Sequence, residues 1–296
     1  MKTGTENLSA RFVGARLPSN LYVPSGEDWP QSRTDVIKHP EVQLFGTAAG
    51  KVWEQRLAGL VEKARARGEK NATILLIAEA VNFVKDPTQI ISTLKRVADS
   101  VEVVFFARDQ RTALPSWLAQ RIQSWTQPGF TRLSFDDLLR PRQRSYKYDE
   151  ILSRWSVAGV RVIPVPFLET DRGTDSLVKR FAKAVKISVP DSSGGQAVNE
   201  SLGEAQLVSL GLFKEQFAWA RRTPGLSALV GWLFNKKRTA FRASPSERWK
   251  PNTAELSRIS DFYADSNANF KMALGKSASE AEWKTWFDSL KFTETV

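Results

Sequence analysis

The stretch VEVVFFARDQRTALPS at residues 101–116 decides the fold. It opens with a short, almost wholly apolar run, as in a parallel strand that is buried on both faces. It then enters a segment in which Leu114, Leu118 and Ile122 recur at helical spacing. Pro115 falls near the first turn of that helix, where proline is tolerated. We therefore predict a strand over 101–107 and a helix over 111–125.

Further strands and helices are predicted on both sides of this stretch. Short apolar runs bounded by polar residues predict buried strands over 71–81 and 160–167. Amphipathic patterns predict helices over 86–100, 146–158 and 175–187. Strands that alternate with helices are typical of the α/β class, an open parallel sheet flanked by helices. Ligands bind such sheets beyond the carboxyl ends of the strands.

The C-terminal third is predicted to be helical. After a loop that follows residue 189, residues 199–296 show helical periodicity and no strand-like run. We predict an α/β core over 1–190 and a helical C-terminal region over 191–296 packed on the same domain. This region contains the basic segment FNKKRTAFR at 234–242. Its five tryptophans are interpreted as packing residues: Trp219, Trp232, Trp249, Trp283 and Trp286.

Composition narrows the class of function. Lys and Arg outnumber Asp and Glu by 43 to 32, which gives a net charge of +11 and a pI near 9.9. Such a surface attracts nucleotide phosphates, acidic glycans, nucleic acid or anionic membranes, although it can also serve solubility alone. The absence of cysteine excludes disulfides and zinc–thiolate sites, and His39 is the only histidine. Without an apolar leader or a run of roughly 18 apolar residues, we predict a cytoplasmic protein with no membrane span.

Two segments carry residues suited to binding phosphate. Lys2, Thr3, Gly4 and Thr5 form a short turn before a helix-like segment, and would present backbone N–H groups, hydroxyls and an ammonium group. Arg108 follows the apolar strand at 101–107, and Ser116 lies eight residues later on the predicted helix. A strand-end arginine and a serine on the next helix can bind one phosphate together, the arginine through charge-assisted hydrogen bonds. Each segment taken alone is also compatible with an ordinary surface loop.

Together these segments resemble the sulfotransferases that use 3′-phosphoadenosine 5′-phosphosulfate, and the bacterial sulfotransferase-like proteins most closely. That family has a Lys-Ser/Thr-Gly-Thr loop for the 5′-phosphosulfate and an apolar strand ending in Arg, with Ser eight positions later, for the 3′-phosphate. Other segments that resemble it are LLIAEAV (75–81), NESLGEAQLVSL (199–210) and ISDFYADSNANF (259–270). The similarity covers nearly the whole chain, and it implies a P-loop-like α/β fold.

The chain departs from the family pattern at three places. The family's loop follows a buried first strand, whereas here Met1 directly precedes Lys2, so either that strand is missing or the start of the protein lies upstream. Glu6 stands where the family usually has a hydroxyl residue; a carboxylate there suits the helix dipole but would repel a phosphosulfate. Asn7 stands where some members place a tryptophan against the adenine.

The resemblance implies an enzyme that transfers a sulfuryl group from the nucleotide donor to a hydroxyl-bearing acceptor such as a carbohydrate. Lys2 would supply a cation to the reacting group, and no metal is required. The general base would be Glu79, which occupies the family's His position at the end of the strand before the Arg strand, or else His39.

Two other functions are compatible with the sequence. The first is a catalytically inactive protein that retains the sulfotransferase fold, which the missing strand and Glu6 favour. The second is a basic protein that binds nucleic acid or another anionic surface through FNKKRTAFR. The sequence lacks a recognisable nucleic-acid-binding motif, which disfavours nucleic acid as the partner. The pattern does not indicate an oligomeric state.

Overall fold

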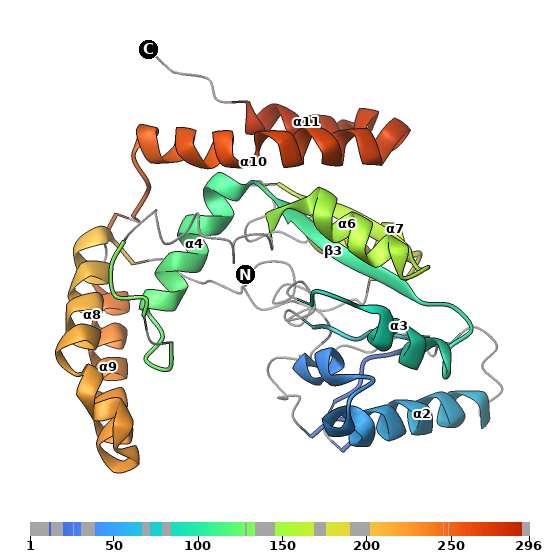
Figure 1. Cartoon of the computed structure of the whole chain (residues 1–296), viewed down its shortest axis with the longest axis horizontal. Coiled ribbons are helices and arrows are strands. Elements are labelled where there is room, and N and C mark those ends of the chain that lie inside the picture. Colours follow the sequence, from blue (N-terminus) through green and yellow to red (C-terminus); the bar gives the residue numbers. More distant parts are fainter. Residues whose placement is uncertain are drawn as a thin grey trace. The chain divides into compact units, whose positions relative to one another are not determined.

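The computed structural model describes residues 12, 20–25, 27–30, 39–66, 72–78, 84–127, 129–133, 146–168, 176–189, 202–244, 246–247 and 249–291 (Figure 1). The protein is of the mixed α/β type, and helices make up most of the described chain. It divides into two compact units. Unit 1 comprises residues 1–108, 144–197 and 265–289, and unit 2 comprises residues 109–143, 198–264 and 290–296.

The described strands all lie in unit 1 and form two parallel pairs. They are β1 (Leu21–Tyr22), β2 (Thr73–Ile74), β3 (Glu102–Arg108) and β4 (Arg161–Phe167). The longer pair is in register from Glu102 opposite Arg161 to Arg108 opposite Phe167. Alternate residues of a strand direct their N–H groups to opposite sides, so Pro164 and Pro166 remove donors from one side of β4 only. That side cannot pair fully with a further strand, which suits β4 to an edge position beside β3.

Helices cover both faces of the longer pair. On one face, α7 (Ser176–Val185) packs Leu177 against Val165 and Phe167 of β4, and its Phe181 lies 6.2 Å from Phe106 of β3 between ring centroids. On the other face, Phe105 stacks on Tyr148 of α6 (Tyr148–Val157) at 6.0 Å. Side chains that alternate along β3 therefore reach two separate helical layers, as in a doubly wound α/β fold.

The aromatic face of β3 is closed by helices from the end of the chain. Phe270, in α10 (Thr253–Leu274), lies 6.2 Å from Phe105 and 6.0 Å from Trp286 of α11 (Ala281–Leu290). α10 passes from unit 2 into unit 1 after residue 264, so only its second half belongs to this cluster. The last helices thus complete the α/β unit.

The shorter pair shares the core beneath α7. Leu21 of β1 and Ile77, just after β2, join Val178 and Phe181 of α7 in one cluster with Val104 and Phe106 packed against it. The remaining elements of unit 1 are helical: α2 (Lys51–Ala66), α3 (Thr88–Lys95) and the 3₁₀ turns η1 (Pro40–Leu44), η2 (Ala48–Gly50) and η7 (Gly275–Ser279).

All the described secondary-structure elements of unit 2 are helices. It contains α4 (Gln110–Ile122), α8 (Glu204–Gln216), η6 (Ala218–Arg222), α9 (Pro224–Ala243) and the first half of α10. α8 and α9 lie side by side (Figure 1). The unit is organised around Trp125, whose ring lies 5.8 Å from that of Phe234 and whose indole N–H donates to the Ser227 carbonyl at 3.2 Å. Gly231 leaves room for that ring, because a Cβ there would lie 2.8 Å from it.

The predicted α/β class is confirmed, and so is the helical C-terminal region. The strands predicted over 101–107 and 160–167 correspond to β3 and β4, while only Thr73–Ile74 of the run at 71–81 is a strand among the described residues. The short strand β1 and the helix α2 were not predicted. The described strands form two separate pairs, and the predicted single open sheet is therefore not confirmed and stays a prediction. The predicted division near residue 190 also stays a prediction; α4 belongs to unit 2 together with α8 and α9.

Candidate functional site

The carboxyl end of the β3–β4 pair holds a buried cation. Arg108 is the last residue of β3 and is 4% exposed. Its guanidinium carbon lies 5.3 Å from the centroid of the Phe167 ring, at the last residue of β4. This is a cation–π contact, in which the guanidinium is attracted to the face of the ring. The cation therefore lies at the edge of the parallel pair where α/β proteins bind ligands.

Tyr148 fixes the backbone of Arg108. Its hydroxyl accepts a hydrogen bond from the Arg108 N–H at 2.9 Å and donates one to the Arg108 carbonyl at 2.7 Å. The tyrosine is itself held by ring contacts with Phe105 and Phe270. The position of the strand end thus depends on a side chain 40 residues away in the sequence. Sequence reasoning missed this role because Tyr148 has only the features of an apolar helix residue.

The helix after Arg108 begins with a strong N-cap. Asp109 accepts a hydrogen bond from the Arg111 backbone N–H at 2.8 Å and also pairs with the Arg111 side chain, Nη2 to Oδ2, at 2.8 Å. Ser116 follows on α4, so the strand, arginine, helix and serine occur in the predicted order along the chain. Arg108 belongs to unit 1 and Ser116 to unit 2. The prediction that both side chains reach one phosphate stays a prediction.

His39 is a buried connector between two chain segments. It is 0% exposed, its Nδ1 accepts from the Ile77 N–H at 2.9 Å, and its Nε2 lies 2.8 Å from the Pro24 carbonyl oxygen. A carbonyl can only accept, so Nε2 carries the proton and the ring is neutral. Burial lowers the pKa of His39 below its ordinary value of 6.5. Both ring nitrogens are thus engaged in hydrogen bonds. The choice between His39 and Glu79 as the general base stays a prediction.

The remaining predicted site residues lie outside the described part of the chain. These are Lys2, Thr3, Gly4, Thr5 and Glu79. Ile77 lies two residues before Glu79 in the sequence, and its N–H and C=O groups both bond to His39. His39 therefore positions the chain two residues before Glu79, at the carboxyl end of β2.

An open groove of about 490 Å³ lies in unit 1 between α6 and the second half of α10. Asp149, Glu150, Ser153, Arg154, Asn269 and Ala273 line it. Asp149 accepts a hydrogen bond from Ser266, and its Oδ2 lies 3.5 Å from the Asn269 amide nitrogen. The carboxylate is thus used to join the two helices. The groove has more acidic than basic groups, so it does not suit an anionic nucleotide.

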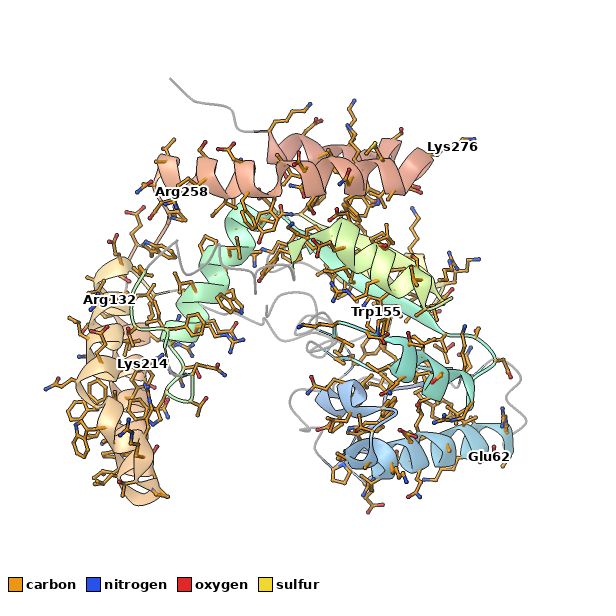
Figure 2. All side chains as sticks on the ribbon, in the orientation of Figure 1. Glu62, Arg132, Trp155, Lys214, Arg258 and Lys276 are labelled. Carbon is orange, nitrogen blue, oxygen red and sulfur yellow. The ribbon has the colours of Figure 1, made fainter. Side chains whose placement is uncertain are left out.

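Unit 2 has a buried lysine that sequence reasoning also missed. Figure 2 labels this residue, Lys214 of α8. Lys214 is 0% exposed and donates to the carbonyl oxygens of Arg121, at 3.0 Å, and Phe130, at 2.8 Å. Burial, reinforced by the nearby charge of Arg221, lowers the pKa of Lys214 to about 8. The ammonium group satisfies the Arg121 carbonyl at the C-terminal end of α4, where a cation also suits the helix dipole, and the Phe130 carbonyl beyond that helix.

A glycine allows α8 to approach closely enough for this contact. A Cβ on Gly211 would lie 1.8 Å from the Thr131 carbonyl oxygen, so no side chain fits there. Arg221 packs nearby with its guanidinium carbon 4.5 Å from the centroid of the Trp125 ring, and its Nε and Nη2 have no hydrogen-bond partner among the residues that the structure describes. The buried Lys214 thus contacts carbonyls, and the half-buried Arg221 contacts a ring. Nothing in this arrangement requires a bound ligand, and we interpret it as structural.

The fold and the site define a mixed α/β protein, and comparisons with known proteins do not assign it to a family. A scan against family models and searches of curated proteins and of solved structures each found no match for the chain. Among the described helices, none is both long and apolar enough to cross a membrane. In the described part of the chain, no three Asp, Glu or His side chains lie close enough together to hold a metal ion.

Proposed function

We propose that this protein transfers a sulfuryl group from 3′-phosphoadenosine 5′-phosphosulfate to a hydroxyl acceptor. One observation carries the proposal. Arg108 ends a buried parallel strand and leads directly into a capped helix that bears Ser116, in the order of the sulfotransferase element for the 3′-phosphate. The resemblance of Lys2, Thr3, Gly4 and Thr5 to the family's 5′-phosphosulfate loop supports the same donor.

The surroundings of Arg108 suit a phosphate ligand. The side chain is almost fully buried against Phe167, so it is already partly desolvated and its position is fixed. A charge-assisted hydrogen bond is stronger in such a site than in water. The backbone contacts of Tyr148 hold the arginine at the strand end before a ligand arrives, which lowers the entropic cost of binding.

The proposed reaction forms a bond between the acceptor oxygen and sulfur. The bond between sulfur and the bridging phosphate oxygen breaks, and 3′-phosphoadenosine 5′-phosphate leaves. Glu79 would take the proton from the acceptor hydroxyl, since the ring nitrogens of His39 already bond to Ile77 and Pro24. Lys2 would stabilise the negative charge that develops on the bridging oxygen.

The donor site is tested by calorimetric titration with 3′-phosphoadenosine 5′-phosphate. We expect Arg108→Met to weaken binding by more than about tenfold, because a hydrogen bond to a charged group contributes roughly 1.5–3 kcal/mol. The matched control is Arg161→Met, which removes an arginine from the amino end of the same strand pair. A thermal melt of each variant tests whether it is folded. Equal affinities of folded wild type and Arg108→Met would exclude Arg108 as a phosphate ligand.

Catalysis is tested separately from binding. We expect Glu79→Gln to retain affinity for the nucleotide but to lower sulfuryl transfer by about a hundredfold or more, the usual contribution of a general base. The assay follows release of 3′-phosphoadenosine 5′-phosphate in the presence of hydroxyl-bearing carbohydrates. Nucleotide binding by wild type without any turnover would favour the inactive protein that retains the fold.

A further inference from the structure

The outer side of α9 has an apolar surface that no described residue covers. Leu226, Leu229, Trp232 and Leu233 recur along one side of the helix, and we call them the apolar stripe. Leu229 is 54% exposed and Trp232 is 51% exposed. The opposite side of α9 is buried through Val230, Gly231 and Phe234. Packing within unit 2 thus uses the inner side only, and the stripe contradicts our interpretation of Trp232 as a packing residue.

The stripe lies beside a concentration of positive charge. Residues 218–243 contain six Lys or Arg and no Asp or Glu. Of these cations, Arg222, Lys236 and Arg242 are exposed, and the Lys236 ammonium lies 4.1 Å from the centroid of the Trp232 ring. Among the residues that the structure describes, none of the six forms an ion pair with a carboxylate. Trp219, just before α9, is 59% exposed.

We propose that α9 binds the surface of an anionic lipid bilayer. The interface of such a bilayer offers an apolar boundary for leucine and tryptophan side chains and anionic headgroups for the flanking cations. A second copy of this surface would be repelled by its own positive charge, and nucleic acid would not cover a row of leucines. The helix packs on unit 2 along its inner side, so it would lie in the plane of the interface. This proposal does not depend on sulfuryl transfer.

Binding is tested with the full chain and vesicles of phosphatidylcholine that contain about one third phosphatidylglycerol. The chain has no cysteine, so Leu229→Cys provides a unique position for a polarity-sensitive fluorophore. We expect a blue shift of its emission with anionic vesicles, a much smaller one with pure phosphatidylcholine, and reversal by high salt. The matched label is at Met272→Cys, which is 72% exposed in unit 1 and should show no shift.

Variants separate the two contributions in a vesicle co-sedimentation assay. Lys236→Glu with Arg222→Glu should weaken binding by more than about twentyfold, because each cation near an anionic surface contributes about fivefold. Leu229→Ser with Leu233→Ser should weaken it by more than about tenfold, since both side chains would enter the acyl boundary. The controls are Lys250→Glu with Lys276→Glu and the single change Met272→Ser, all at exposed positions outside 218–243.

Four outcomes would overturn the proposal. The first is the absence of binding to anionic vesicles, and the second is equal binding by the charge variant and its control. The third is an emission shift that grows with protein concentration in the absence of lipid. The fourth is that RNA binds more tightly than the vesicles and displaces them. The third would indicate a second copy on the stripe, and the fourth nucleic acid. Circular dichroism establishes that each variant is folded, as expected for changes at exposed positions.

Discussion

His39 in unit 1 and Lys214 in unit 2 are buried side chains that bond to the backbone in different charge states. In unit 1, His39 is neutral and Tyr148 is uncharged, and each exchanges hydrogen bonds with two backbone groups. In unit 2, Lys214 is a cation held by two backbone carbonyls. Burial of a charge costs far more than burial of a neutral group, even when it is hydrogen-bonded. We therefore expect the stability of the two units to depend on pH in different ranges.

The largest expected effect concerns His39 in unit 1. We expect His39→Leu to lower the free energy of unfolding by about 3 kcal/mol, because it leaves the Ile77 N–H and the Pro24 carbonyl unpaired. Urea denaturation at pH 8 measures this, and hydrogen exchange should localise the loss to unit 1. Val52→Ala, at an exposed position of the same unit, should cost less than about 0.5 kcal/mol. A loss below about 1 kcal/mol for His39→Leu would show that these bonds contribute little.

His39 also makes unit 1 sensitive to acid. Its pKa is lowered in the folded protein, so below its ordinary value of 6.5 the unfolded chain binds a proton that the folded chain does not. The contribution of His39 to the free energy of unfolding is therefore fully present above pH 6.5 and falls as the pH decreases toward the pKa of the folded protein. The chain has no other histidine, so comparing wild type with His39→Leu at pH 7.5 and 5.5 isolates this contribution. Equal slopes for both proteins would contradict it.

The second effect concerns Lys214 in unit 2, which changes stability at alkaline pH, whereas His39 does so at acid pH. Its pKa is about 8 in the folded protein and about 10.5 when unfolded, so between these values the unfolded chain binds more protons. The free energy of unfolding should rise from pH 8 to pH 10.5, by at most about 3 kcal/mol. Denaturation of wild type and Lys214→Met at pH 7.5, 9 and 10 measures the difference. The exposed Lys250→Met should retain the wild-type slope.

A further variant sharpens the account of this lysine. Arg221 lowers the pKa of Lys214 through charge repulsion, so Arg221→Met should reduce the rise in stability at alkaline pH. If Arg221→Met leaves the slope unchanged while Lys214→Met abolishes it, desolvation alone accounts for the lowered pKa. If neither variant changes the slope, Lys214 keeps an ordinary pKa and the contrast between the units is wrong.

The smallest effect lies at Asp109, the first residue of unit 2. Asp109→Ala should cost about 1 kcal/mol, the usual contribution of an aspartate N-cap. Arg111→Met keeps the cap and removes only the ion pair, so it should cost less. Chemical denaturation of both variants measures the two contributions. A larger loss for Arg111→Met would assign the stability of this helix start to the ion pair instead.

Elements with a strong local pattern could be predicted from the sequence. The apolar runs at 101–107 and 160–167 are long enough to indicate strands, and the helices around them follow from their periodicity. β1 could not be predicted, because two residues are too few to form a pattern. α2 has the charges and apolar spacing of an ordinary amphipathic helix, but no predicted strand precedes it in the sequence.

The candidate site was predictable only in part, because partners far apart in sequence define it. Arg108 is conspicuous at the end of an apolar strand, whereas its connection to Tyr148 depends on how α6 packs. His39 has the features of a loop histidine suited to proton transfer, until Pro24 and Ile77 are brought to its two nitrogens. Lys214 resembles any helix surface lysine, and only the approach of α8 to the 129–133 segment buries it.

That close approach has a consequence for how the protein can evolve. Lys214 reaches two carbonyls because Gly211, one turn earlier, lets the backbone of α8 come near Thr131. A larger residue at 211 would force α8 away and leave the ammonium group buried without its acceptors. A descendant that replaced the lysine with an apolar residue would lose the main reason to keep the glycine. We therefore expect the two positions to be inherited as a pair, glycine followed by lysine three residues later, and to be lost together.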